Sequence, residues 1–334
     1  MKILVVGKKN HLFWSEHVCD ALKDLDIDHN LFLYNDLPLT THCFLKMTKL
    51  LNKRYADELL SHYFSYVIQT YNPDIILLIS AFFLPDTIYH VLQKIKNKIS
   101  IVGWVGDAFN HTVEHKALTC NHLYCTDSYF VDYARKEYNW NHVAYLPLAY
   151  NPHIFSHSVS QAFSERTGVY FVGNPALDRL ELLKCITTPV HLVGSKWKKH
   201  SLKQHIIHGK NISIHSVSKI YQQCRGVINI KQEVNVINGL NMRSFEATAC
   251  GALMIHDNVA DIKKHFVPNE EILVYNNVEE LNDLLQNINK NPQSFYEIAQ
   301  RGMQRTLLEH SYKHRMAHVL GNLSYNGKAN EGEY

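Results

Sequence analysis

The sequence lacks any apolar run long enough to cross a membrane as a helix. The longest run, residues 75–84, has about half the length of a membrane-spanning helix and follows an Asn-Pro-Asp turn signal at 72–74. This pattern predicts a buried parallel strand. Only four apolar residues, 3–6, precede Gly7 and two lysines, which predicts a first β-strand and not a signal peptide. We therefore expect a cytoplasmic protein with at most peripheral contact to the inner face of the cell membrane.

Glycine and proline are scarce, at 14 and 9 residues, and no repeat is present, which argues against disordered linkers. The seven cysteines form no Cys-x-x-Cys pair and are odd in number, so we expect reduced thiols; they stand at positions 19, 43, 120, 125, 185, 224 and 250. His115, Cys120, His122 and Cys125 lie close together in the sequence, but their spacing fits no structural zinc module. We expect no metal site.

An excess of charge of one sign is also missing, because 34 basic residues face 31 acidic ones, for a net charge of +3. This balance lacks the excess of basic residues that is typical of nucleic-acid-binding proteins, so we expect no nucleic-acid partner. Lys46, Lys49, Lys53 and Arg54 form a local basic cluster, which predicts a solvated helix face or, alternatively, a surface for an acidic acceptor or a membrane.

Strand-like and helix-like stretches alternate along the whole chain. Apolar, β-branched runs occur at 2–6, 28–34, 74–80, 100–105, 122–126 and 142–146, and again at 169–173, 190–194, 212–215, 226–231, 252–256 and 272–275. Residues 44–69 give the longest helical pattern. This alternation predicts an α/β protein with two doubly wound, Rossmann-like sheets, which bind ligands at the carboxyl ends of their strands.

The alternation breaks near residues 148–166, where prolines and serines interrupt it. We interpret residues 1–150 as the first domain, 151–166 as a hinge, 167–320 as the second domain and 321–334 as a tail that need not be ordered. The last helices, within 292–323, are expected to pack on the second domain and to cross back to the first.

Residues 238–257 are the most informative segment and predict a loop, a helix and a strand. Asn241 can cap the first helical turn, and Gly251 can supply the left-handed residue that ends the helix. The start of such a helix binds anions through its free N–H groups and its dipole. Met242, Phe245 and Ala249 recur at helical spacing and are expected to face the sheet.

Arg243 and Glu246 share another face of this helix. A guanidinium near the helix start, with a carboxylate one turn later, suits a nucleoside diphosphate, because the first meets phosphate oxygens and the second accepts ribose hydroxyls. The alternative is a solvated ion pair between residues three apart.

This stretch resembles the donor-nucleotide helix of group 1 glycosyltransferases, in particular the branch similar to the spore-maturation protein CgeB. That branch has the pattern Asn-x-Arg-x-Phe-Glu, followed by Ala and a small residue before Gly and then by an apolar strand that ends in Asp. The matching residues are Asn241, Arg243, Phe245, Glu246, Ala249, Cys250, Gly251 and Asp257. The similarity continues at 146–152, 170–174, 266–281 and 310–315 and covers roughly the C-terminal half. The larger retaining branch has an earlier glutamate where this chain has Asn238, so the role of that glutamate is not carried over.

The resemblance implies the GT-B fold, in which two Rossmann-like domains face each other across a cleft. It implies transfer of a sugar from a nucleotide-diphosphate sugar to a hydroxyl of a carbohydrate, lipid-linked or protein acceptor, in surface polysaccharide, glycolipid or glycoprotein synthesis. The first domain then holds the acceptor and the second the nucleotide-sugar, at Gly239, Leu240, Asn241, Arg243 and Glu246. No cofactor is implied. The only Asp-x-Asp run, at 24–28, reads as a solvated turn, so a divalent metal is not expected to be essential.

Five further residues are candidates for the donor site. Gly173 and Asn174 end a strand, where the missing side chain lets the backbone approach a phosphate, although a tight turn explains them equally well. Arg179 resembles an arginine of the branch and has a phosphate or a neighbouring carboxylate as its partner. Lys196 and Trp197 follow the next strand, and the tryptophan either packs on the base or anchors the surface.

Asp107 and His111 follow a Trp-containing strand and are candidates for binding or deprotonating the acceptor hydroxyl. In the resembling branch an aspartate occupies this place. The alternative is that Asp107 only forms a turn and caps the next helix. Asp127 is a weaker candidate and more simply caps a helix starting at Ser128. Stereochemistry stays open. Similarity to the group 1 enzymes suggests retention, but the missing first glutamate weakens that inference, and inversion requires Asp107 or His111 as general base.

Two other classes of function use the same architecture. A nucleotide-sugar 2-epimerase has the same diphosphate site but needs several carboxylates that converge on the sugar, and the sequence shows no such local cluster. A non-catalytic nucleotide-sugar-binding partner module binds the donor without turnover. Product analysis with a panel of nucleotide-sugars separates the three.

Overall fold

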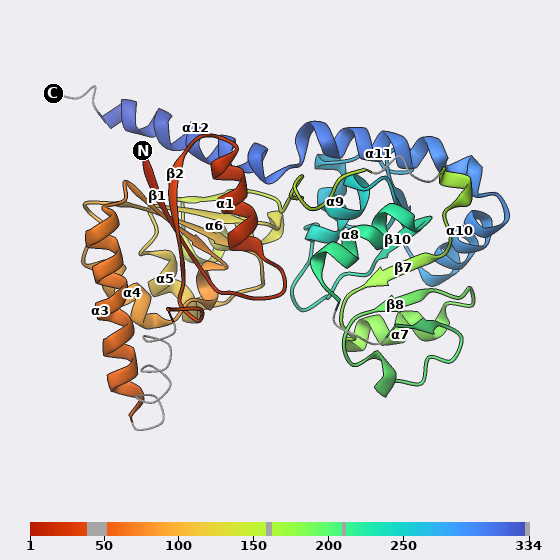
Figure 1. Cartoon of the computed structure of the whole chain (residues 1–334), viewed down its shortest axis with the longest axis horizontal. Helices are drawn as coiled ribbons and strands as arrows, with labels where there is room; N and C mark the ends of the chain where they lie inside the picture. The colour runs from red at the N-terminus through yellow and green to blue at the C-terminus, as the bar shows by residue number, and fades with distance from the viewer. Residues whose placement is uncertain (39–51, 158–161, 209–211, 331–334) are drawn as a thin grey trace. The chain divides into compact units, whose positions relative to one another are not determined.

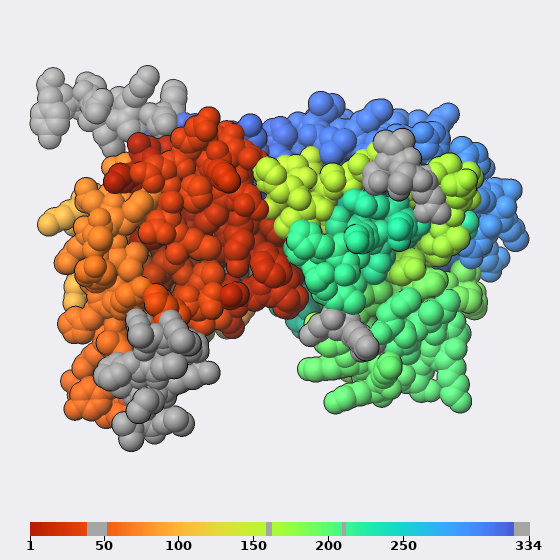
Figure 2. All heavy atoms as spheres, in the orientation of Figure 1, coloured from red at the N-terminus to blue at the C-terminus, as the bar shows by residue number. Residues whose placement is uncertain are grey.

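The computed structural model describes residues 1–38, 52–157, 162–208 and 212–330; Figures 1 and 2 draw the other residues in grey. The chain divides into two compact units. The first contains Met1–Pro147 together with the C-terminal segment that begins at Arg315, and the second contains Leu148–His314. Both are α/β units, as the alternation of the sequence predicts.

The first unit is built on a six-stranded parallel sheet in the order β2-β1-β3-β4-β5-β6. Its strands are β1 Lys2–Gly7, β2 Asp28–Leu33, β3 Ile75–Ile79, β4 Ser100–Val105, β5 His122–Cys125 and β6 Val143–Tyr145. The α-helices of its described residues are α1 Trp14–Lys23, α3 Lys53–Tyr71, α4 Asp86–Gln93, α5 Glu114–Ala117, α6 Ser128–Tyr138 and α12 Tyr312–Asn330, which begins in the second unit. Short 3-10 turns η1 Ala81–Phe83 and η2 His111–Val113 follow β3 and β4. All five residues of β3 are buried, as expected for a strand covered on both faces.

The second unit repeats this plan with the strand order β12-β11-β10-β7-β8-β9. Its strands are β7 Val169–Val172, β8 His191–Val193, β9 Ile206–Ile207, β10 Gly226–Asn229, β11 Leu253–Asp257 and β12 Leu273–Tyr275. Its helices are α7 Leu177–Cys185, α8 Ile214–Gln223, α9 Met242–Ala249, α10 Val278–Lys290 and α11 Tyr296–Glu309, with 3-10 turns η3 Phe163–Glu165, η4 Trp197–Lys199, η5 Ala260–Lys264 and η6 Pro292–Phe295. Two doubly wound sheets are thus confirmed.

Some element predictions differ from the structure. Residues 212–215, expected as a strand, instead start α8, because Ser213 takes the N-cap position and its Oγ accepts a hydrogen bond from the Ser216 N–H (3.2 Å). A capping serine outweighs so short an apolar run. Of the predicted helix at 44–69, residues 44–51 lie outside the described residues, and with them Lys46 and Lys49 of the basic cluster; α3 covers the rest.

The boundaries between the units also differ from those expected. The N-terminal part of the first unit ends at Pro147. Residues 148–150, expected in the first domain, and the described residues of the expected hinge, 151–157 and 162–166, belong to the second unit, where Tyr150 pairs with Ser311. Residues 321–330, expected as a tail, continue α12 as helix. This helix returns to the first unit, since Arg315 Nε donates to the Pro147 carbonyl (3.0 Å). None of the helices in the described part of the chain combines the length and the apolar composition needed to span a bilayer.

Candidate functional site

The second sheet has its topological switch point between β7 and β10. From β7 the chain proceeds to β8 and β9 on one side, and it then returns to β10 and continues to β11 and β12 on the other. In such sheets ligands bind at the carboxyl ends of the strands beside the switch point. The residues that follow β7 and β10, and the helix α9 reached from β10, therefore frame a candidate site.

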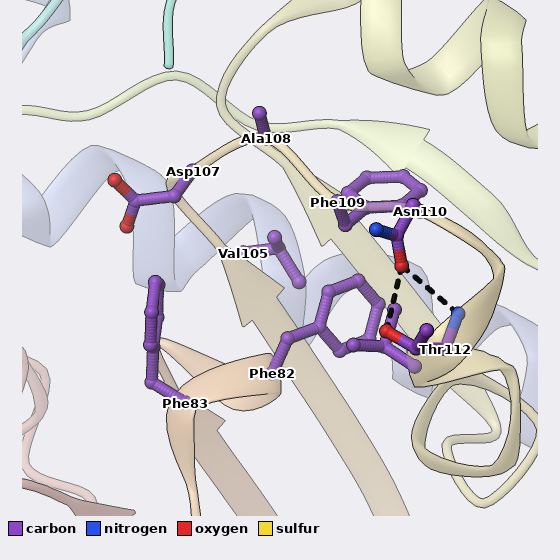
Figure 3. A pocket seen from close by; sticks show the side chains of 9 residues that line it. Phe82, Phe83, Val105, Asp107, Ala108, Phe109, Asn110 and Thr112 are labelled. Atoms are coloured by element: carbon purple, nitrogen blue, oxygen red, sulfur yellow. Dashed lines mark hydrogen bonds between the residues drawn. The ribbon is translucent and has the colours of Figure 1, made fainter. Parts of the chain in front are cut away.

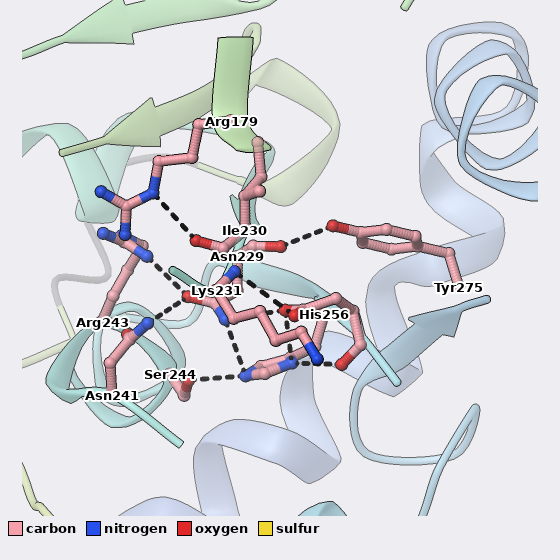
Figure 4. A network of polar contacts seen from close by, with 10 residues as sticks. Arg179, Asn229, Ile230, Lys231, Asn241, Arg243, Ser244, His256 and Tyr275 are labelled. Atoms are coloured by element: carbon pink, nitrogen blue, oxygen red, sulfur yellow. Dashed lines mark hydrogen bonds and ion pairs between the residues drawn. The ribbon is translucent and has the colours of Figure 1, made fainter. Parts of the chain in front are cut away.

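Arg243, in the first turn of α9, connects the two strands at this point (Figure 4). Its Nε donates to the Val172 carbonyl at the end of β7 (2.7 Å), and its Nη1 donates to Asn229 Oδ1 at the end of β10 (2.6 Å). A Cβ atom on Gly173 would lie only 3.0 Å from Arg243 Nη2. The glycine thus leaves room for the guanidinium, which is a more specific reason for its presence than a tight turn.

Arg179 brings a second guanidinium to the same place from α7. Its Nε donates to the Ile230 carbonyl (3.2 Å) and its Nη1 to the Asn174 carbonyl (3.0 Å). Both arginines lie over the ring of the buried Phe171, at 4.8 Å for Arg243 and 5.4 Å for Arg179, a cation–π arrangement. Figure 4 shows the two guanidinium groups next to each other.

The two positive charges have no directly bonded carboxylate among the described residues. Burial and, secondly, the charge of Arg243 lower the pKa of Arg179 to about 10, and burial also lowers the pKa of Arg243. The four hydrogen bonds just described go to neutral carbonyl and amide oxygens. Neither arginine forms an ion pair with a carboxylate among the described residues. Carboxylates nearby offset the two charges only in part, since burial still lowers both pKa values. Two adjacent cations without a directly bonded carboxylate are suited to a doubly charged anion.

The start of α9 lies beside this pair. Asn241 occupies the N-cap position as predicted, but its side chain does not cap the helix. Its Nδ2 donates to Asn229 Oδ1 instead (2.7 Å), and its Oδ1 is buried without a hydrogen-bond partner in the described residues. The expected side-chain cap is therefore wrong, and the first-turn N–H groups have no side-chain partner from it. Gly251 has the predicted left-handed backbone (φ 76°).

Glu246 stands one helical turn after Arg243 and is partly exposed. Burial raises the pKa of its carboxyl to about 8, and the charge of Arg243 offsets this only in part. No hydrogen bond or ion pair to this carboxylate occurs within the part of the chain that is described. The alternative of a simple Arg243–Glu246 ion pair is thus not what the structure contains.

The remaining predicted donor residues lie in the loops that follow β7, β8 and β10. Asn174 is exposed, and its Oδ1 accepts hydrogen bonds from the N–H (3.0 Å) and the Oγ (2.8 Å) of Ser195, so it joins the loops after β7 and β8. Lys196 is exposed, with a left-handed backbone (φ 70°). Gly239 and Leu240 are buried in the loop that leads to α9.

Trp197 has a different place from the one expected. Its indole is fully buried, packs edge-on against Phe171 (5.8 Å) and donates from Nε1 to the Gly173 carbonyl (2.8 Å). The ring therefore offers no face for a base to stack on, and its role in the structure is to hold the strand end that carries Gly173.

Sequence reasoning missed Asn229, which organises the site. It is 1% exposed, and it binds both Arg243 and Asn241 through Oδ1. The available signal was an amide side chain at the end of a buried apolar strand, directly before the loop to the helix. In contrast, nothing in the spacing revealed that Phe171 would lie under both arginines.

In the first unit, Asp107 lines a small pocket at the end of β4 (Figure 3). Its neighbours there include three aromatic rings, and the full lining consists of Phe82, Phe83, Val105, Asp107, Ala108, Phe109, Asn110, Thr112 and Val113. Burial raises the pKa of the Asp107 carboxyl, which accepts no hydrogen bond from any residue the structure describes. The pocket thus presents one carboxylate among largely apolar walls.

The capping alternative for Asp107 is not realised, because Asn110 caps the following turn η2 by accepting from the Thr112 N–H (3.0 Å). His111 is exposed on η2 and is not among the residues that line the pocket, so the structure does not bring the two acceptor-side candidates together there. Asp127 caps α6, with Oδ1 accepting from the Tyr129 N–H (2.9 Å), as expected.

Two of the four residues considered for zinc, His115 and Cys120, have other partners. His115 contacts Asp86 (3.3 Å), and Cys120 Sγ donates to the Lys116 carbonyl (3.5 Å). Over the described ranges, no group of three or more His, Cys, Asp or Glu residues could hold a metal ion.

Residues 174–321, which contain most of this site, match a protein family described as glycosyl transferase-like. None of the curated proteins matches the chain.

Solved structures similar to this chain extend over almost its whole length. A sucrose-phosphate synthase from Thermosynechococcus elongatus has a TM-score of 0.68 at 12% identity, covering 99% of this chain and 100% of its own. HepE of Anabaena, in complex with UDP and glucose, has a TM-score of 0.67 at 11% identity, covering 97% and 100%. The lipopolysaccharide outer core galactosyltransferase WaaB has a TM-score of 0.58 at 14% identity, covering 96% and 99%. At these identities the likeness establishes the fold, which is the expected GT-B fold.

Proposed function

We propose that this protein is a glycosyltransferase that moves a sugar from a nucleotide-diphosphate sugar to an acceptor hydroxyl. The observation that carries the proposal is the pair Arg179 and Arg243, two guanidinium groups without carboxylate partners among the described residues, over one aromatic ring at a sheet switch point. The leaving nucleoside diphosphate carries about two negative charges, which this pair and the start of α9 are placed to neutralise. The match of residues 174–321 to a glycosyl transferase-like family supports the same reaction.

The donor is bound in the second unit. The diphosphate contacts Arg179 and Arg243, the N–H groups at the start of α9, and the loops that contain Gly173, Asn174 and Lys196. The Glu246 carboxyl group, one turn deeper in α9, accepts hydrogen bonds from the ribose hydroxyls. HepE, which has the same fold, is a complex with UDP, and this favours a nucleotide donor here. The residue pattern of α9 supports the finer proposal that the chain belongs to the CgeB-like branch.

The acceptor belongs to the first unit, beside Asp107. A carboxyl in an apolar pocket with no hydrogen-bond partner among the described residues is suited to accept the proton of an acceptor hydroxyl. Carbohydrate, lipid-linked and protein hydroxyls all fit this chemistry, in the synthesis of surface polysaccharide, glycolipid or glycoprotein. The arginine pair supplies the positive charge that a divalent metal provides elsewhere, so transfer is expected to continue in the presence of EDTA.

The reaction is tested with a panel of UDP-, GDP-, CMP- and dTDP-sugars. Slow release of free nucleotide, accelerated by an acceptor, supports a transferase. Isomerisation of the sugar without nucleotide release indicates the 2-epimerase, and binding without turnover across acceptors indicates a partner module. Either of the last two results contradicts the proposal.

Glu246 gives this site a measurable pH dependence in the ligand-free protein. Because burial raises its pKa from 4.5 to about 8, its contribution to stability is fully present below the lower value and is lost as the pH rises through the higher one. The free energy of unfolding of the wild type, relative to Glu246→Gln, is therefore expected to fall between about pH 5 and pH 8. Urea unfolding at several pH values measures this difference.

Glu297→Gln is a suitable control, because Glu297 is 82% exposed in its pair with Arg301. The difference in free energy of unfolding between the wild type and this variant should change little over the same pH range. Parallel pH profiles for the wild type and Glu246→Gln would show that the Glu246 carboxyl titrates normally and is not in the environment described.

A further inference from the structure

Below the arginine pair lies a buried polar network that connects β10, β11 and α9 (Figure 4). Its members are Asn229, Ser244, His256 and Asp257. His256 and Ser244 are 0% exposed and Asn229 is 1% exposed. Buried polar groups stabilise one arrangement only when each donor meets an acceptor, so the hydrogen positions in this network can be worked out.

The orientation of the Asn229 amide follows from its two outer partners. Arg243 Nη1 (2.6 Å) and Asn241 Nδ2 (2.7 Å) both lie at Oδ1, and a guanidinium can only donate. The oxygen must therefore face Arg243. The Nδ2 group then faces inward, toward Asp257 Oδ1 (2.9 Å) and His256 Nε2 (3.0 Å).

The tautomer of His256 follows from the same reasoning. Its Nδ1 lies 2.7 Å from the Asp257 carbonyl and 3.1 Å from Asp257 Oδ1. Both are acceptors, so Nδ1 carries the hydrogen. The unprotonated Nε2 then accepts from Asn229 Nδ2 and from Ser244 Oγ (3.0 Å).

We infer that His256 is a positioning residue for the donor site. As a neutral imidazole with its hydrogen on Nδ1, it holds the Asn229 amide so that Oδ1 faces α9, and Asn229 in turn holds the Arg243 guanidinium in the position that binds the diphosphate. This rests on the proposed function of the arginine pair. Substrate cannot reach His256 or Ser244, since both are fully buried, so the Ser-His-Asp arrangement here acts through Asn229 and is not a nucleophilic triad.

Replacing His256 tests this role. His256→Phe keeps a ring of similar shape but removes the acceptor for Asn229 Nδ2, and it is expected to weaken binding of a nucleoside diphosphate about tenfold. His256→Gln retains an acceptor oxygen and is expected to recover part of that loss. Isothermal titration calorimetry with UDP and GDP measures both. In a double-mutant cycle, adding His256→Phe to Arg243→Lys should cost much less than it costs in the wild type, because the two residues act in one chain of contacts.

His205→Phe is the matched control. His205 is also a buried histidine of the second unit, and it bonds to the Leu183 carbonyl (2.7 Å) and the Val190 N–H (3.2 Å), outside this network. It should lower thermal stability without lowering nucleotide affinity. Unchanged affinity in His256→Phe, or additive losses in the cycle, would overturn the inference while leaving the arginine site intact.

Two results separate the inference from the function on which it rests. If the wild type binds none of UDP, GDP and dTDP, the proposed function fails and the inference fails with it. The tautomer is tested without ligand by the ¹⁵N chemical shifts of the His256 ring, which should show the hydrogen on Nδ1. A hydrogen on Nε2 would overturn the inference even if nucleotide binds.

Discussion

Arg243→Met is expected to weaken binding of a nucleoside diphosphate by about 100-fold, or roughly 3 kcal/mol. The substitution removes one of two adjacent charges and also the hydrogen bonds to Val172 and Asn229 that connect β7 and β10. Arg243→Lys should recover little, because an ammonium keeps the charge but cannot bond to both strand ends and the ligand with one planar group. Titration calorimetry with nucleoside diphosphates measures the loss.

Arg301→Met is the control for this experiment. Arg301 belongs to α11 of the same unit but bonds to the Glu270 carbonyl and pairs with Glu297, so it should leave nucleotide affinity unchanged. Thermal unfolding of Arg243→Met checks that the second unit still folds. If a folded Arg243→Met binds nucleotide as tightly as the wild type does, the anion lies elsewhere.

Asp107→Asn is expected to lower sugar transfer by about 100-fold or more while nucleotide affinity stays the same. The amide keeps the shape of the carboxylate but cannot accept the proton of the acceptor hydroxyl. Nucleotide affinity is preserved because Asp107 belongs to the first unit and the arginine pair to the second. Initial rates of transfer, together with calorimetric titration of the nucleotide, separate the two effects.

The matched control is Asp127→Asn, the same chemical change after the neighbouring strand. Asp127 caps α6 through the Tyr129 N–H, and asparagine is an equally good cap, so activity and stability should change little. Full transfer by Asp107→Asn would remove this residue from the reaction. Loss of transfer in Asp127→Asn alone would move the acceptor side to the end of β5.

The fold could be predicted from the sequence because its signal is repeated. Most strands of the two six-stranded sheets are short apolar runs between helical stretches. The prediction failed where a single polar residue decided the outcome. Ser213 turned an apolar run into the start of α8, and the two-residue strand β9 is too short to leave a pattern.

The site was predictable where it is local in sequence. Arg243 and Glu246 lie one turn apart on one helix, so their proximity could be predicted from spacing. The contacts that hold Arg243 come from residues 71 and 14 positions away, at Val172 and Asn229, and such long-range contacts leave no periodicity. The position of Trp197 could not be predicted either. A tryptophan after a strand gives the same sequence pattern whether its ring faces a ligand or the core.

The most direct test of the central claim is a crystal structure of the protein soaked with a nucleoside diphosphate. The account predicts diphosphate density at the end of β7 and the start of α9, with oxygens about 3 Å from the guanidinium groups of Arg179 and Arg243. Density for the diphosphate anywhere else, with both arginines still bonded only to Val172, Asn229, Ile230 and Asn174, would contradict it.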